Sequence, residues 1–374
     1  MSEREWDAIV VGGGIIGLSI AWRASLQGLS VTVLERERSP AGASWMAAGM
    51  LAPVTEATFG ENDLLALNLE GARRWPGFLK ELEDCSGMKL ERLDNGTLFV
   101  ALDRDQAEAL RRLYDYQESL GLEVAWLNSR ACRQLEPALH PRARSAVLAE
   151  ADGAVDPRDV IRGLASALRR AGVTVRRGAC VVSVEAGENA GVLLSDGEKV
   201  SGKRTVLAAG CWSGSIRGIP GPIRKAVRPV KGQILRLRCQ SNARPLIGHV
   251  VRTEDVYLVP RPNGELVAGA TVEEKGFDTT LTAGGVFELL RAADEVVPGI
   301  RELELVEAGV GLRPGTPDNM PLIGNCAPGL IVATGHYRNG VLQAPVTGDA
   351  VAHLLVHGQV PEEIACFNPT RFEP

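Results

Sequence analysis

Two short apolar stretches flank a longer one at the start of the chain. Residues 7–11 read as a buried strand, residues 15–27 as a helix after a glycine-rich turn, and residues 31–34 as a second buried strand that ends on Glu35. This order, over about 30 residues, is typical of a strand–helix–strand unit with parallel strands. We therefore expect the chain to open with a parallel sheet covered by a helix.

Helical patterns continue downstream. Apolar residues recur near helical spacing at 63–83, and another helix is predicted at 105–120. Asp156 followed by Pro157 predicts a helix start, because the aspartate can cap free N–H groups and proline suits the first helical position. We expect this helix to end before Gly172.

Strands alone dominate from residue 227 to about residue 270, which predicts an antiparallel sheet in a second domain. The α/β character returns with a buried strand at 330–334 and a closing helix at 341–357. We see no internal repeat or low-complexity linker, so we expect the domains to be interleaved. The other predicted strands lie at 173–176, 181–184, 192–194, 205–208, 232–238, 256–259 and 266–270.

Composition and charge narrow the possible functions. The 374 residues carry a net charge of −5, and the basic pairs are short and scattered, which disfavours a nucleic-acid binder. The seven cysteines form no CxxC pair and the chain has no HExxH motif, so we expect reduced thiols and no metal site. These features predict a cytoplasmic protein.

The apolar run at residues 8–24 could be mistaken for a signal peptide or a membrane span. Acidic residues precede it, the glycines at 12–14 split it, and it is shorter than the ~20 residues that a membrane helix needs. A strand, a turn and a helix explain the run better, and we expect no membrane partner.

The sharpest motif is a G-x-G-x-x-G pattern between the first strand and the first helix, made by Gly12, Gly14 and Gly17. Such glycines allow a tight turn, close approach to a pyrophosphate and close helix packing, while the helix N-terminus attracts the anion. Glu35 ends the next strand, where a carboxylate can accept hydrogen bonds from ribose. The motif predicts dinucleotide binding and leaves NAD and FAD open.

Further motifs follow in a fixed order along nearly the whole chain. They are ASWMAAGML at 43–51, LAAG at 207–210, GLRPGT at 311–316 and GHYRNG at 335–340. Together with the opening motif, they resemble the FAD-dependent D-amino-acid oxidase family, and most closely its glycine oxidase branch, which is linked to thiamine biosynthesis. The resemblance implies an α/β (α+β) fold in which a Rossmann-like FAD-binding domain is interleaved with an antiparallel-sheet substrate domain.

The resemblance also implies the domain bounds and the cofactor contacts. Residues 1–80, 150–220 and 308–374 would form the FAD-binding domain, and residues 81–149 and 221–307 the substrate domain. Gly311 stands where sarcosine oxidase relatives attach flavin through a cysteine, so non-covalent FAD is expected. The implied cofactor contacts are Gly12, Gly14, Ile15, Ile16, Gly17, Glu35, Arg36, Ser44, Ala47, Ala48, Gly49, Met50, Val182, Ala209, Gly210, Trp212, His336, Arg338, Asn339, Gly340 and Val341.

Three residues would bind the substrate and so serve catalysis. The resemblance makes Arg313 the main clamp for the substrate carboxylate, which a planar guanidinium can bind through two hydrogen bonds. Tyr257 would add a hydrogen bond, and Arg338 would close the pocket. Without the resemblance, an arginine is more often on the surface and a strand tyrosine is more often in the core.

The family's reaction would then follow. Hydride passes from the substrate Cα to flavin N5, the imine hydrolyses to an oxo acid and ammonia, and oxygen yields hydrogen peroxide. The implied substrate is glycine, with sarcosine and small D-amino acids as further candidates. The helix expected from Val341 would direct its positive end toward the flavin. Family members form homotetramers, so a homo-oligomer is expected.

Some alternatives stay open. Glycine oxidases often have a histidine two residues before the strand tyrosine, where this chain has Asp255, so the substrate preference is less firmly indicated than the fold. A dehydrogenase that passes electrons to a quinone would share this fold, although no basic amphipathic helix indicates a membrane anchor. A tRNA-modifying flavoprotein is disfavoured by the acidic charge. A non-catalytic FAD-binding module would give Arg313 and Tyr257 no role.

Overall fold

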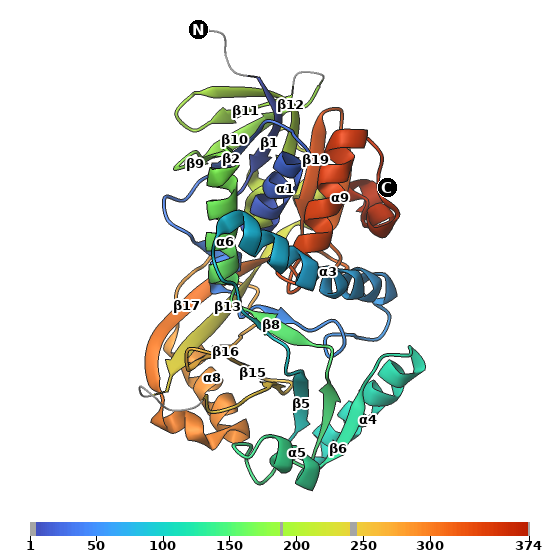
Figure 1. The fold of residues 1–374 in the computed structure, drawn as a ribbon, viewed down its shortest axis with the longest axis vertical. Coiled ribbons are helices and arrows are strands. Elements are labelled where there is room, and N and C mark those ends of the chain that lie inside the picture. The colour runs from blue at the N-terminus through green and yellow to red at the C-terminus, as the bar shows by residue number, and fades with distance from the viewer. Residues whose placement is uncertain (1–4, 188–189, 240–244, 373–374) are drawn as a thin grey trace.

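The computed structural model describes residues 5–187, 190–239 and 245–372. Within these ranges the strands form three sheets, two of eight strands and one of three. Figure 1 shows the two large sheets in separate parts of the molecule, with β1, β2 and β12 in the upper part and β5, β13 and β16 in the lower part. The strands of each large sheet come from separate stretches of the sequence, so the chain passes repeatedly between the two parts.

The first large sheet contains the predicted opening strands. β1 pairs in parallel with β2 and β12, and parallel pairing continues from β2 to β9 and from β12 to β19. β10, β11 and β18 extend the sheet by antiparallel pairing. The bounds are Trp6–Val11 for β1, Val31–Glu35 for β2, Thr174–Arg177 for β9, Val181–Glu185 for β10, Gly191–Leu194 for β11, Lys199–Leu207 for β12, Leu322–Ala327 for β18 and Leu330–Thr334 for β19.

Helices cover this sheet and share its core. Trp22 of α1 packs edge-on against Phe78 of α3 with 5.1 Å between the ring centroids, and both rings are buried. Asp156 accepts a hydrogen bond from the Arg158 backbone N–H and caps α6, as predicted. The bounds are Ile15–Leu26 for α1, Asn62–Ser86 for α3, Pro157–Arg170 for α6 and Ala344–His357 for α9.

The second large sheet has the order β17-β13-β16-β15-β14-β5-β7-β6, and all its pairs except β5–β14 are antiparallel. Helix α8 packs on it around a buried apolar core that includes Leu235, Leu258 and Leu289. The bounds are Thr97–Ala101 for β5, Ala125–Asn128 for β6, Ser145–Ala149 for β7, Arg228–Arg238 for β13, Val250–Arg252 for β14, Tyr257–Pro260 for β15, Glu265–Gly269 for β16, Glu304–Gly315 for β17 and Ala283–Val296 for α8.

A small sheet of β3, β8 and β4 joins these parts. Asp152, which precedes β8, accepts hydrogen bonds from the Val54 N–H, the Thr55 N–H and the Thr55 hydroxyl at 3.0, 3.0 and 2.6 Å. This carboxylate is fully buried, and burial raises its pKa to about 6. Asp152 therefore fixes the segment after β3. The bounds are Met50–Leu51 for β3, Arg92–Leu93 for β4 and Gly153–Val155 for β8.

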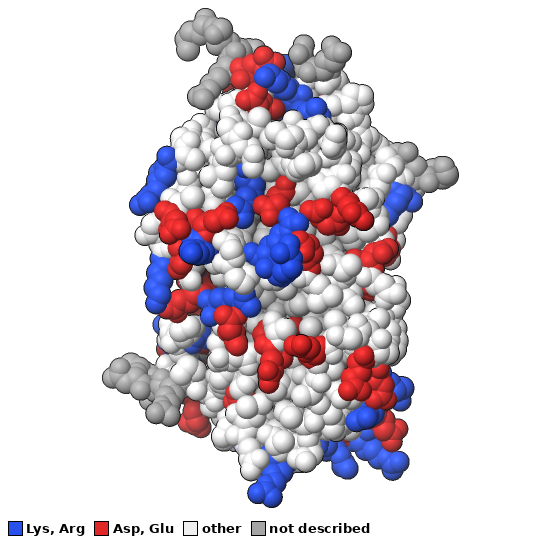
Figure 2. All heavy atoms as spheres, turned by 45° about the vertical axis from the view of Figure 1, so that its right-hand side comes forward, with Lys and Arg blue, Asp and Glu red and all other residues white. Residues whose placement is uncertain are grey.

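The remaining elements are short or lie at the surface. They are the α-helices α2 (Gly42–Met46), α4 (Arg104–Ser119), α5 (Ser129–Leu135) and α7 (Gly221–Ala226), and the 3-10 helices η1 (Gly210–Ser215), η2 (Pro298–Glu302), η3 (Glu362–Phe367) and η4 (Pro369–Phe372). On the face drawn in Figure 2, acidic and basic side chains are intermingled. None of the helices in the described ranges combines the length and the apolar character that a bilayer crossing requires.

The predicted fold class is confirmed, because a mainly parallel α/β sheet is interleaved with a mainly antiparallel one. The closing helix differs from its predicted bounds, since α9 begins at Ala344 and residues 341–343 form turns. The predicted start at Val341 is therefore wrong by three residues. Strand β17 stays paired with β13 to Gly315. We keep the division into two interleaved domains as a proposal.

Candidate active site

A cavity of about 970 Å³ lies between the two large sheets. Its walls come from the turn after β1, the end of β2, the segment 41–50 and the strands β13, β15 and β17. The loop after β19 completes the lining. Every site residue predicted from the sequence except Gly17 lines this cavity, although the predictions came from segments more than 300 residues apart.

The turn after β1 is built for close approach. Gly12 has a φ of +113°, and a Cβ at this position would overlap the carbonyl oxygen of Ala208. A Cβ at Gly17 would overlap the carbonyl oxygen of Gly12, so Gly17 permits the packing of α1 against the turn without lining the cavity. Helix α1 begins at Ile15, whose backbone N–H donates to the Ser44 hydroxyl at 3.1 Å.

Glu35 fixes the carboxyl end of β2 beside this turn. One carboxylate oxygen accepts the Gly13 backbone N–H at 2.6 Å, and the other accepts the Glu37 backbone N–H at 2.7 Å. The neighbouring Arg36 guanidinium lies over the Trp212 ring at 4.3 Å from its centroid. These side chains form one end of the cavity, which Val182 and Gly210 also line.

The cofactor loop, defined here as residues 44–50, lines the cavity with small side chains. Gly49 has a φ of +78°, its carbonyl accepts the Val155 N–H at 2.9 Å, and a Cβ there would overlap the Val155 carbonyl oxygen. Met46 packs against Gly311, where an added Cβ would lie 3.0 Å from the Met46 Cβ. The small residues of this loop thus leave space along one wall of the cavity, which Met46 and Met50 also line.

Arg313 of β17 and Tyr257 of β15 both line the cavity. The sequence did not indicate which residues leave space for these two side chains. The Arg313 guanidinium donates to the Thr271 carbonyl at 3.0 Å. A Cβ at Gly232 would overlap this guanidinium, and a Cβ at Gly269 would lie 2.6 Å from the Tyr257 hydroxyl. Two glycines on neighbouring strands therefore make room for the two side chains.

Burial determines the protonation of the tyrosine and of a nearby histidine. Tyr257 has a pKa raised by burial, opposed by the positive charge of Arg313, so the phenol stays protonated near neutral pH. Burial lowers the pKa of His336 to about 3, and its Nε2 lies 3.1 Å from the Thr347 hydroxyl. His336 is therefore a neutral side chain in the wall.

The cavity is also lined by charged residues that no sequence motif indicated. Glu56 and Arg252 line it and form an ion pair at 2.6 Å. Arg252 also donates to the Thr55 carbonyl at 2.8 Å. Arg338 and Asp255 lie in the same wall, so the end of the cavity near Tyr257 carries charges of both signs.

The loop after β19, which also lines the cavity, differs from the prediction in one respect. Asn339, Gly340 and Val341 line the cavity as predicted, but the helix N-terminus lies beyond them, at Gln343. Residues 340–343 are thus loop backbone, and the positive end of the α9 dipole is about one turn farther along the chain than predicted.

The fold and this site define a dinucleotide-binding protein of the Rossmann-like class: a parallel strand–helix–strand unit with a glycine turn that admits close approach, and a carboxylate at the end of the second strand. Residues 7–354 match the family model described as FAD dependent oxidoreductase. The chain belongs to this family and is an FAD-dependent enzyme.

Individual proteins resemble the chain over its full length. The glycine oxidase of Geobacillus kaustophilus (strain HTA426) is 32% identical over 375 residues, covering 99% of this chain and 98% of the relative. The crystal structure of glycine oxidase from Geobacillus kaustophilus aligns with a TM-score of 0.91 at 30% identity, covering 98% of this chain and 99% of that one. The bifunctional protein ThiO/ThiG of Trichormus variabilis is 32% identical over 373 residues, and the match covers 98% of this chain but 55% of that relative.

Proposed function

We propose that the chain is a glycine oxidase that binds FAD non-covalently and converts glycine, oxygen and water into glyoxylate, ammonia and hydrogen peroxide. The observation that carries the proposal is the placement of Arg313 and Tyr257 in the same cavity as the glycine turn and the cofactor loop. The similarity to proteins named glycine oxidase supports the choice of substrate.

The residues present fit the proposed cofactor. The glycine turn has no space for a Cβ at Gly12, which lets backbone N–H groups near Gly14 and Ile15 approach a pyrophosphate. The Glu35 carboxylate would bind ribose, and Val182 would lie at the adenine. The cofactor loop would accommodate the flat ring system. FAD, when bound, accepts hydride from the substrate and passes the electrons to oxygen.

The protein's own residues would bind and orient the substrate. The Arg313 guanidinium would hold the substrate carboxylate, and the protonated Tyr257 hydroxyl would donate a further hydrogen bond to it. Arg338, which also lines the cavity, would close the pocket. Holding the carboxylate fixes the direction of Cα and converts an encounter into a unimolecular step. Charge–charge contacts are stronger here than in water, because the site is largely buried.

We further propose that the imine product supplies thiazole formation in thiamine biosynthesis, since the bifunctional relative joins a similar chain to a second protein. We also propose that the protein is a cytoplasmic homotetramer. Light scattering after size-exclusion chromatography measures this directly, and a monomer at micromolar concentration would contradict it.

The experiment that tests the function uses the purified holoenzyme. Excess glycine is added without oxygen while the visible flavin absorbance is recorded, and air is then admitted. We expect the absorbance to bleach and to return with formation of peroxide. Absence of bleaching with glycine would overturn the substrate proposal and direct the test to sarcosine and D-alanine. Bleaching that a quinone reverses and oxygen does not would instead indicate a dehydrogenase.

A further inference from the structure

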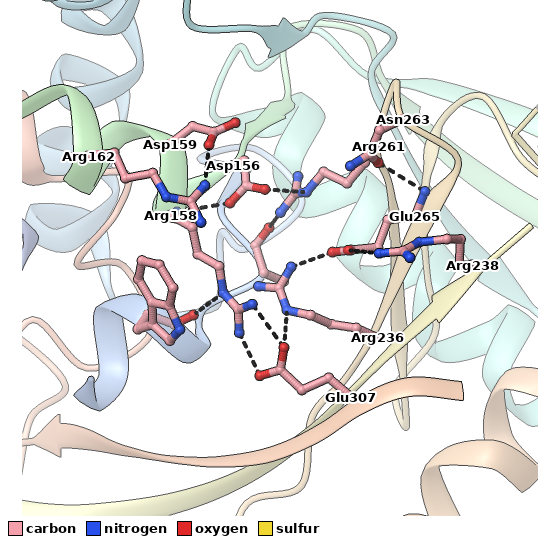
Figure 3. A network of polar contacts seen from close by, with 12 residues as sticks. Asp156, Arg158, Asp159, Arg162, Arg236, Arg238, Arg261, Asn263, Glu265 and Glu307 are labelled. Carbon is pink, nitrogen blue, oxygen red and sulfur yellow. Dashed lines mark hydrogen bonds and ion pairs between the residues drawn. The ribbon is translucent and has the colours of Figure 1, made fainter. Parts of the chain in front are cut away.

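A group of buried and partly buried charged side chains lies directly behind the cofactor loop, outside the cavity. We call it the arginine cluster: Arg158, Arg236 and Arg261 with Asp156, Glu265 and Glu307 (Figure 3). Its three arginines come from α6, from β13 and from the residue that follows β15. The cluster therefore connects the two parts of the fold on the side of the loop that faces away from the cavity.

Arg261 connects the antiparallel sheet to the cofactor loop. It directly follows β15, the strand that carries Tyr257, and its guanidinium donates to the Ala48 carbonyl. Its Nε lies 3.8 Å from the Asp156 carboxylate at the start of α6. The residue is 4% exposed, so little water reaches its guanidinium, and this burial lowers its pKa.

Arg158 approaches the same loop from the other part of the fold. Its Nε donates to the Trp45 carbonyl at 3.1 Å, and its two terminal nitrogens donate to the Glu307 carboxylate at 2.9 and 2.7 Å. Glu307 belongs to β17, the strand that also carries Arg313. One guanidinium thus bonds both to the loop and to the strand of the proposed carboxylate clamp.

Arg236 connects the remaining members. It is 2% exposed on β13, it pairs with Glu265 of β16, and its Nε lies 4.0 Å from Glu307. Two of its guanidinium nitrogens have no hydrogen-bond partner among the described residues. A shift of Glu307 would therefore leave Arg236 with less compensation for its buried charge, which resists movement of β17 relative to β13.

We propose that Arg158 and Arg261 are positioning residues that set the distance between the cofactor loop and the strands that carry Tyr257 and Arg313. Both act through the main chain of the loop and through carboxylates, and neither lines the cavity. The inference rests on the proposed function for the roles of Tyr257 and Arg313. The link between the cluster and the cofactor loop is independent of the substrate.

The test compares Arg261→Met and Arg158→Met with two control variants in the holoenzyme. Arg169→Met is the control for Arg158, because Arg169 also lies on α6, is exposed and donates a hydrogen bond to Ser166 of the same helix rather than to the cofactor loop. Arg238→Met is the control for Arg261, because Arg238 reaches the same cluster through Glu265 at 3.9 Å but is 48% exposed.

Three readouts are measured on each variant: FAD release on dilution, binding of glycolate from the change in the visible spectrum, and urea unfolding. Glycolate has the carboxylate of glycine without the amine. We expect both cluster variants to bind glycolate about tenfold more weakly and to release FAD faster, since small misplacements in a site cost factors of this size or more. The controls should stay within about twofold of the unchanged enzyme.

Arg261→Lys separates positioning from charge. Lysine keeps the positive charge, but it lacks the planar guanidinium whose N–H groups point in fixed directions toward Ala48 and Asp156. It should recover stability against urea more than it recovers glycolate binding. If Arg261→Met does not fold, Arg261→Lys alone decides the test.

The proposal is overturned if the cluster variants lose stability while FAD release and glycolate binding stay within about twofold of the unchanged enzyme. It is also overturned if a control variant loses as much glycolate binding and FAD retention as the cluster variants. If the unchanged enzyme does not bind glycolate, the proposed carboxylate site fails, and FAD release still tests the cluster.

Discussion

Two glycines on neighbouring strands, Gly232 and Gly269, leave the space that Arg313 and Tyr257 occupy. Neither glycine belongs to a motif, and a glycine in a strand has many explanations, so the sequence could not assign them. Gly12 and Glu35 could be assigned, because their spacing on a strand–helix–strand unit has a specific physical purpose. Glu56 and Arg252 were missed for another reason: their pairing depends on the route of the segment after β3, which no local pattern reveals.

Replacing Arg313 tests the carboxylate clamp. In Arg313→Met the proposed partner of the substrate carboxylate is lost, and loss of one member of a buried charged pair costs about 3 kcal/mol. We expect kcat/KM for glycine to fall about 100-fold, mainly through KM. Arg228→Met is the control, since Arg228 pairs with Glu274 near the same strands but is 44% exposed. Unchanged steady-state kinetics of Arg313→Met would contradict its role.

Replacing Gly12 tests the glycine turn. In Gly12→Ala the new methyl group would overlap the Ala208 carbonyl, and the backbone would have to hold a φ of +113°. We expect the purified variant to contain little FAD, measured by its absorbance relative to protein. Gly77→Ala is the control, because a Cβ at Gly77 meets open space on helix α3. A Gly12→Ala protein with the normal FAD content would show that the turn does not approach the cofactor.

At the scale of elements, periodicity predicted the helices and most strands of the first sheet within a few residues, since long apolar patterns depend little on tertiary contacts. Strand β18 was not predicted, and β12 begins at Lys199, six residues before its predicted start. Short strands such as β3, β4 and β8 were not predicted, because two or three residues carry no pattern. The closing helix was predicted to start too early, since the apolar Val341 and Leu342 are buried in turns and so resemble helical core positions.

Asp152, beside the small sheet, makes the stability of the fold depend on pH. Its pKa is about 6 in the folded chain against 3.8 for the ordinary group, so its contribution to stability is complete below pH 3.8 and is lost as the pH rises through about 6. In Asp152→Asn this titration is absent. Between pH 4.5 and 7.5 the free energy of unfolding of the unchanged protein should fall by about 2 kcal/mol relative to the variant.

The measurement is urea unfolding at several pH values on both proteins. The neutral, buried His336 contributes with the opposite sign, because its lowered pKa makes the fold less stable as the pH falls below about 6.5. Both proteins contain His336, so its contribution cancels in the difference. A pH-independent difference would show that the Asp152 pKa is not raised.

At the scale of the whole molecule, the cavity lies between the two large sheets, so the cofactor should hold them together. Removal of FAD should lower the free energy of unfolding by about 2.7 kcal/mol relative to holoenzyme at a hundredfold excess of FAD over its Kd. Hydrogen exchange should accelerate at β15 and in the cofactor loop. Helix α4, which does not line the cavity, is the internal control, and equal acceleration there would indicate general unfolding.

The sequence indicated two interleaved units, but it could not show how they contact each other. The arginine cluster illustrates the reason. Arg158 and Glu307 are 149 residues apart, and each reads alone as an ordinary surface charge. Their pairing becomes visible only when the sheets are placed side by side.

The interleaving of the strands also affects how the protein is made. Residues 205–207 at the end of β12 pair with β1 on one side, but they acquire their second partner only when β19 has been synthesised, about 120 residues later, which takes about 6–25 s at ribosomal rates of about 5–20 residues per second. During that interval an apolar strand edge of the nascent chain lies open to pairing with other chains. We expect the yield of soluble protein to depend on chaperones that cover this edge, and to rise when they are co-expressed.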